Sequence, residues 1–258
     1  MSVVHLFIYV LSGFVAGVMN AVAGGGSVLL FPLLLSLGIP AVTANATMSL
    51  IVQPGSATSA YGYRHHLKKL PKRYYWLLLP TFLGALVGAA LLVRTSTVAF
   101  QHFVPFFMAF AVLLLAFQRQ IHHFLYTKKG IALEKRHRRL ILVIASLAFF
   151  GIAIYGGYFG AGFGIITLAF LGYTELSDIQ QMNGLKNLSV LSVGMADALY
   201  FTHYHMIDWK ILPFFALGNL FGGLVGATYG SRLPARTMRA IVLLIATALT
   251  VFLFWKFR

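Results

Sequence analysis

Eight apolar segments divide this chain, and each has close to the 20 residues that a helix needs to cross the hydrocarbon core of a bilayer. They cover residues 4–22, 41–63, 74–93, 98–117, 140–157, 184–201, 211–230 and 238–257. Two further apolar pieces, 27–38 and 163–173, are too short, because a 12-residue helix spans only about 18 Å. The sequence therefore predicts an all-α polytopic membrane protein with eight full transmembrane helices and two half-helices that follow glycine breaks.

Composition and charge agree with a membrane protein. The chain is 59% hydrophobic and 10% charged, whereas a soluble domain carries about 25% charged residues. Its formal charge of +15 comes from Lys and Arg in short loops between apolar segments, which is typical of an inner-membrane protein and not of a nucleic-acid-binding surface. No basic residue precedes segment 4–22, so we expect a retained membrane helix there and not a signal peptide.

The two halves of the chain resemble each other. The run Gly84 to Ala89 recurs as Gly222 to Ala227, 138 positions later, and the same offset relates Asn45 to Asn183. It also carries Gly24 and Gly26 onto Gly162 and Gly164, while Gly55 matches Gly194 with a slip of one residue. We therefore expect a first transmembrane repeat over 1–117, a basic cytoplasmic linker over 118–139, and a second transmembrane repeat over 140–258.

Loop charges predict that the repeats are inverted. Fifteen Lys and Arg residues cluster in 64–73, 118–139 and 231–239, whereas loops 94–97 and 202–210 carry one each. Basic loops face the cytoplasm, so each loop of the first half and its counterpart in the second half should lie on opposite sides. Inverted repeats with broken helices are a transporter architecture, with the substrate near the bilayer midplane.

The glycine breaks at 23–27 and 160–164 are candidate anion sites. Free amides at the start of a half-helix carry partial positive charge and bind anions without a charged side chain. The predicted backbone ligands are Gly24, Gly25, Gly26, Ser27, Gly162 and Gly164. The same glycines could instead serve only close helix packing.

Segments 41–63 and 184–201 are too polar to face lipid. Asn45, Ser49, Gln53 and Ser56 share one helical face of the first. The candidate side-chain donors to a substrate are Asn45, Thr47, Ser49, Asn183, Lys186 and Asn187. Asp197 is a coupling candidate, because charges within a membrane segment are costly and usually functional. Lys186 could alternatively extend to the cytoplasmic surface, and Asp197 could have only a structural partner.

We expect no catalytic residues, no metal and no cofactor. The chain has no cysteine, and the spans contain no paired carboxylates, no His-Glu metal motif and no Ser/His pair at catalytic spacing. The expected partners are a small anionic substrate and the lipid bilayer, with proton coupling possible and no nucleic acid. Glycine pairs four residues apart could serve internal packing or a homodimer interface. They are Gly13/Gly17, Gly84/Gly88 and Gly222/Gly226.

The chain resembles the sulfite exporter TauE/SafE family. The resemblance rests on Gly13 to Gly17, the break at 23–27, Phe31 to Leu34, Gly38 to Pro40, Ala44 to Thr47, the basic loop after Tyr63, and the glycine-rich stretches at 156–164 and 222–226. The family's second glycine-rich stretch is often followed by a proline, which is absent from 165–170 here. The resemblance implies a carrier in the bacterial inner (plasma) membrane for sulfite, a sulfonate or a related small sulfur-containing anion, by export and with the proton gradient as a candidate driving force.

From the sequence we expect a secondary transporter that moves this anion by alternating access. A passive anion channel is the main alternative. The lack of catalytic motifs in the spans argues against an intramembrane enzyme, and the polar helices argue against a membrane scaffold. The exact anion, the direction of transport, the coupling ion and the oligomeric state stay open.

Overall fold

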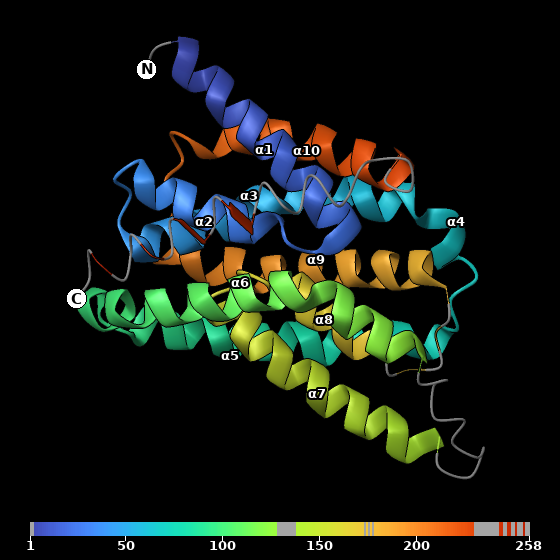
Figure 1. The fold of residues 1–258 in the computed structure, drawn as a ribbon. Coiled ribbons are helices and arrows are strands. Elements are labelled where there is room, and N and C mark those ends of the chain that lie inside the picture. The colour runs from blue at the N-terminus through green and yellow to red at the C-terminus, as the bar shows by residue number, and fades with distance from the viewer. Residues whose placement is uncertain are drawn as a thin grey trace.

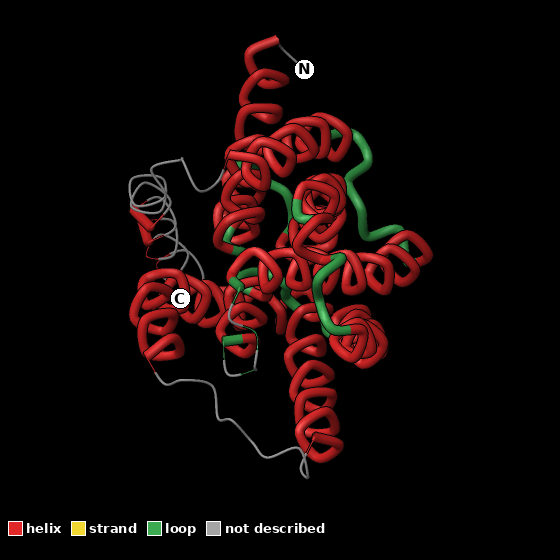
Figure 2. The backbone as a smooth tube through the Cα atoms, turned by 90° about the vertical axis from the view of Figure 1, so that its right-hand side faces the viewer, coloured by secondary structure: helices red, strands yellow, loops and turns green. Residues whose placement is uncertain are grey.

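A computed structural model describes residues 3–127, 138–172, 174, 176, 178–229, 243–244, 247–248, 251 and 255. Every regular element within them is a helix (Figure 2). In chain order these are α1 (Val3–Ala23), α2 (Gly26–Ser36), α3 (Ala41–Gly62), α4 (Arg64–Leu67), η1 (Lys72–Leu77), α5 (Leu78–Arg94), α6 (Thr97–Thr127), α7 (Arg138–Tyr158), α8 (Phe163–Leu171), α9 (Ile179–His203) and α10 (Leu212–Tyr229).

The expected helices are found wherever the structure describes the chain. Four helical stretches are long and apolar enough to cross a membrane, namely Val3–Ala23, Lys72–Arg94, Thr97–Phe117 and Leu212–Tyr229. The half-helices correspond to α2 and α8, with 11 and 9 residues, and the polar segments to α3 and α9. Most of the expected span 238–257, and the basic residues Arg232, Arg236 and Arg239, lie outside the described residues.

Several boundaries differ from the sequence-based expectation; helix α9, for example, begins at Ile179 and not at residue 184. The third span begins with the 3-10 helix η1, which follows Pro71. Short 3-10 segments of this kind are frequent at helix starts. Helix α6 continues to Thr127, ten residues beyond the expected end at 117. Hydropathy marks where the apolar region ends, and Gln, Arg and His after that point are compatible with a continuing helix.

Helix α5 places most of its large apolar side chains outside and small ones inside. On α5, Leu79, Leu83, Val87 and Leu91 are exposed at four-residue intervals. Its opposite face buries Gly84, Ala85, Gly88 and Ala89. Lipid tails are as apolar as leucine, so membrane helices gain little by burying large side chains and associate through small ones. The outer face of α5 therefore suits a bilayer.

Each half of the chain packs its helices against the other half. Helix α1 contacts α10, and α5 contacts α7. A Cβ added at Gly218 or Gly222 of α10 would lie 1.9 or 2.0 Å from carbonyl oxygens of α1. Likewise, a Cβ at Gly84 or Gly88 of α5 would lie 2.2 Å from a carbonyl oxygen of α7. All six glycines of the three pairs noted in the sequence make such contacts within the chain, so they serve internal packing.

Helices α3 and α9 run antiparallel through the middle of the molecule, between α1 and α10 on one side and α5 and α7 on the other (Figure 1). At one end, Gly184 near the start of α9 lies against Leu67, just beyond the end of α3. At the other end, Asp208, just beyond α9, donates its amide to Thr47 Oγ1 at 2.9 Å. This pair brings most of the buried polar side chains into the centre.

Candidate functional site

The two glycine breaks meet in the centre of the molecule. Gly24, Gly160 and Gly162 have φ angles of 76°, 75° and 84°, a left-handed conformation that glycine adopts without a steric cost. A Cβ at Gly24 would lie 2.6 Å from the carbonyl carbon of Gly164, and a Cβ at Gly164 would lie 2.8 Å from Gly24 Cα. Only glycines allow the two backbones to approach this closely.

Ser27 joins the breaks by hydrogen bonds. Its hydroxyl accepts from the Gly162 amide at 3.3 Å and donates to the Gly160 carbonyl at 3.5 Å. Some of the amides expected to bind an anion already have an acceptor. The Gly162 amide donates to Ser27, and the Gly24 amide donates to the carbonyls of Met19 and Asn20. Among the described residues, the amides of Gly26 and Ser27, the first two of α2, have no backbone acceptor.

A cavity of about 30 Å³ lies where the breaks and the polar helices meet, and we call it the central cavity. Its lining comprises Asn20, Ser27, Met48, Ser49, Val52, Gln53, Gly156, Gly160, Phe163, Gly164, Val190 and Val193. Three of the predicted binding residues, Ser27, Ser49 and Gly164, are in this lining. A volume of this size holds about two water molecules.

Lys186 is fully buried in the protein and does not extend to the surface. Its ammonium group donates to the carbonyl oxygens of Asn20 and Ala21, the latter at 3.1 Å. These are among the last carbonyls of α1 and carry partial negative charge. The Asn20 carbonyl also accepts from the Gly24 amide, and the Ala21 carbonyl from the Tyr63 hydroxyl at 3.4 Å. Lys186 therefore caps the broken end of α1, and it has no carboxylate partner among the described residues.

Asn45 caps the broken helix of the other half, although Met48 and not Asn45 is the repeat equivalent of Lys186. Its side-chain amide donates to the carbonyl of Tyr158, the last residue of α7, at 3.0 Å. Each polar helix thus caps the broken helix of the opposite half, one with an amide and the other with a cation.

Four further predicted residues lie outside the cavity lining. Asn187 Nδ2 donates to the Asn183 carbonyl at 2.9 Å within α9, and the side-chain oxygens of both residues are buried without a partner. Thr47 is occupied by the Asp208 amide. Predicted Gly25, between α1 and α2, has the side chain of Leu115 as its nearest neighbour, and it too is absent from the lining.

Asp197 is 1% exposed and accepts a hydrogen bond from the Ser49 hydroxyl through Oδ2. Its Oδ1 atom is buried without a partner, and no basic group pairs with it in the described part of the chain. Next to this pair, Gln53 donates to the Ser49 carbonyl at 2.6 Å. Gln53 also fills the space over Gly194, where a Cβ would lie 1.9 Å from Gln53 Cδ.

Sequence reasoning missed several cavity residues. Asn20 lines the cavity, donates to Ser56 Oγ at 3.1 Å and supplies a carbonyl to Lys186. The available signal was its position as the one amide side chain within α1. Gln53 was recognised on the polar face of α3 but not among the binding residues. The apolar members of the lining carry no sequence signal of their own.

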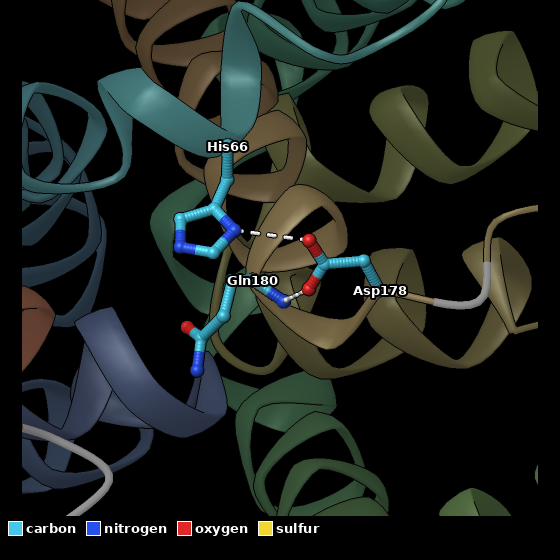
Figure 3. A network of polar contacts seen from close by, with 3 residues as sticks. All are labelled: His66, Asp178 and Gln180. Atoms are coloured by element: carbon cyan, nitrogen blue, oxygen red, sulfur yellow. Dashed lines mark hydrogen bonds and ion pairs between the residues drawn. The ribbon is translucent and has the colours of Figure 1, made fainter.

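A polar contact also joins the halves at the basic rim (Figure 3). His66 Nδ1 lies 2.9 Å from Asp178 Oδ2, and the Gln180 amide donates to Asp178 Oδ1 at 2.8 Å. Burial acts to raise the pKa of Asp178, but the hydrogen bonds from His66 and the Gln180 amide outweigh it, so the pKa is lowered. Asp178 is thereby the N-cap of α9 as well as the partner of His66.

Comparison with known proteins identifies the family of this chain. Residues 9–253 match the family model described as sulfite exporter TauE/SafE. A "probable membrane transporter protein" of Haemophilus influenzae is 29% identical over 246 residues, which cover 92% of this chain and 90% of that protein. The "probable membrane transporter protein ORF9" of a Sinorhizobium species is 25% identical over 253 residues, covering 96% and 92%. No solved structure matches the chain significantly. The chain belongs to the sulfite exporter TauE/SafE family of membrane transporters.

Proposed function

We propose that the protein is a secondary transporter that exports a small sulfur-containing anion, such as sulfite or a sulfonate, across the bacterial inner membrane. The observation that carries the proposal is the central cavity, formed where two glycine breaks meet between two polar helices. Transporters of the broken-helix type bind their substrates in such a place. The family name supplies the sulfur-containing anion.

The surroundings of the cavity suit an anion. Lys186 is a buried basic side chain without a carboxylate partner in the described residues, and it donates to the carbonyl of Asn20, a cavity residue. The amides that begin α2 point their partial positive charge toward the breaks. An anion admitted to the cavity would meet these donors together with Ser27.

Two arrangements support inverted repeats and alternating access. Helices α3 and α9 occupy equivalent places in the two halves and run antiparallel. Helices α1 and α7 have equivalent places in the two halves, as have α5 and α10. The contact of α1 with α10 therefore corresponds to the contact of α7 with α5. Sulfite has four non-hydrogen atoms, and a cavity with room for about two waters must enlarge to admit it. That requirement favours a carrier, which rearranges at every cycle, over a passive anion channel.

Sulfite flux into proteoliposomes tests the proposal. We expect saturable flux of radiolabelled sulfite that responds to an imposed pH gradient. Ser27→Ala removes the hydroxyl that joins the breaks and should lower flux about tenfold, since a lost buried hydrogen bond costs about 1–2 kcal/mol. Ser36→Ala, on the exposed end of the same helix, is the matched control and should transport normally. Absence of flux for every sulfur-containing anion would refute the substrate, and non-saturable flux with a matching current would indicate a channel.

A further inference from the structure

Ser49 stands between the central cavity and a buried acid. Its side chain is part of the cavity lining, and its hydroxyl donates to Asp197 Oδ2. A serine hydroxyl has one hydrogen to donate, so this hydrogen is not available to the cavity while Asp197 accepts it. The second carboxylate oxygen, Oδ1, is buried with no partner.

Few other charged groups surround Asp197. Helix α9, which carries Asp197, packs mainly against α3 and α5. Each of these two helices carries one titratable side chain, at the end away from Ser49 or Leu78. Those groups are Tyr61 and Arg94. On α9 itself and just beyond it, the titratable groups are Lys186, eleven residues away, and, toward the other end, Tyr200, His203, Tyr204, His205, Asp208 and Lys210. None of them forms an ion pair or hydrogen bond with Asp197.

We propose that Ser49 is a proton-controlled hydrogen-bond donor, which makes a proton on Asp197 and an anion in the central cavity bind together. The proposal rests on the proposed function, because it requires an anion in the cavity. With Asp197 ionised, the Ser49 hydrogen is held by the carboxylate. With Asp197 protonated, the carboxyl hydrogen donates to Ser49 Oγ, and the Ser49 hydrogen turns to the anion.

Charge acts in the same direction as the hydrogen bond. An ionised Asp197 next to the cavity repels an anion, and the repulsion is strong in a poorly hydrated interior. Protonation of Asp197 removes this repulsion and at the same time frees the Ser49 hydroxyl to donate to the anion. Linkage is reciprocal, so anion binding must in turn favour protonation of Asp197. The two ions then cross in the same direction, and export is driven by the outward anion gradient against the inward proton gradient.

Calorimetric titration of the purified chain with sulfite, in two buffers of different protonation enthalpy, counts the protons taken up. Sulfite itself titrates, so each count is compared with Asp197→Asn, whose amide also donates to Ser49 and mimics the protonated acid. We expect the wild type to take up on the order of one more proton per bound sulfite than this variant. Equal counts would overturn the proposal, whereas no sulfite binding by the wild type would overturn the proposed function.

Variants of Ser49 test its position in the linkage. Ser49→Ala should bind sulfite about tenfold more weakly, and its proton count should fall toward that of Asp197→Asn. Ser49→Thr retains the hydroxyl and should restore both. The control is Ser192→Ala, which removes an α9 hydroxyl that donates to the Leu78 carbonyl of α5. This variant should behave as the wild type. A Ser49→Ala protein with wild-type affinity and proton count would overturn the proposal.

Discussion

Individual buried polar side chains in this protein donate hydrogen bonds to backbone carbonyls at the glycine breaks. Lys186 donates to two carbonyls of α1, and Asn45 donates to one carbonyl of α7. An unpaired carbonyl at membrane depth costs several kcal/mol. These side chains therefore stabilise the breaks in addition to any contact with substrate.

Lys186→Met separates the capping role from mere packing. Methionine has a similar length, and Met48 occupies the equivalent place in the first half. We expect the variant to lose about 1–2 kcal/mol of stability, because two buried carbonyls each lose one donor and keep only the Gly24 amide and the Tyr63 hydroxyl. Thermal unfolding in detergent measures the loss, with Lys210→Met, at an exposed position, as the control. Equal unfolding temperatures for Lys186→Met and the wild type would contradict the role.

The pair of His66 and Asp178 predicts a pH dependence of stability. The pKa of Asp178 lies below its ordinary value of 3.8 in the folded protein. The carboxylate therefore contributes stability above that value, and the contribution is lost as the pH falls through the lower, folded pKa. Both side chains are more than a third exposed, so we expect a contribution of about 0.5 kcal/mol.

Asp178→Asn measures this contribution, because asparagine is an equally good N-cap. Chemical unfolding at several pH values should find the variant less stable near neutral pH, with the difference disappearing below about pH 4. A difference that persists unchanged in acid would have to come from the cap or from packing.

At the scale of whole helices, glycine determines how closely the elements pack. Gly218→Ala on α10 would place a methyl group 1.9 Å from the Val10 carbonyl oxygen, so α1 and α10 must separate. We expect a loss of about 1–3 kcal/mol from this overpacking. Gly151→Ala on α7 meets no atom within 4 Å and should be neutral or stabilising, since alanine favours helix by about 1 kcal/mol. Comparison of the two unfolding temperatures tests the packing; similar values would contradict it.

The sequence predicts helices well where a single property decides them. Apolar length locates α1, α5, α6 and α10, and the shortness of 27–38 and 163–173 identifies the half-helices α2 and α8. Positions of side chains in the site depend on how distant segments meet, and spacing along one helix does not contain this information. Thus Ser49 lines the cavity, whereas Thr47, two residues away, accepts a hydrogen bond from the Asp208 amide. Asn20 was missed because its role comes from contacts with α3 and α9.

For the molecule as a whole, the antiparallel α3 and α9 and the distribution of basic loops lead to one topology. Residues 64–73 should face the cytoplasm and residues 202–210 the opposite side. Each loop has an exposed lysine, Lys68 in the first and Lys210 in the second.

Single-cysteine variants test this topology directly, since the chain has no cysteine of its own. In intact spheroplasts, we expect a membrane-impermeant thiol reagent to label Lys210→Cys and to leave Lys68→Cys unlabelled until the membrane is opened. Labelling of both variants from the outside would rule out the inverted arrangement. The unsubstituted protein is the control for background.

The cap on α1 has a consequence for synthesis at the ribosome. The lysine that pairs with the carbonyls of Asn20 and Ala21 is encoded 166 and 165 residues later. The first half of the newly made chain must therefore wait in the bilayer without the Lys186 donor at the end of α1 until α9 has been inserted. Maturation is then completed late, and nascent chains that stop before α9 should be recognised as unfinished and degraded by membrane proteases.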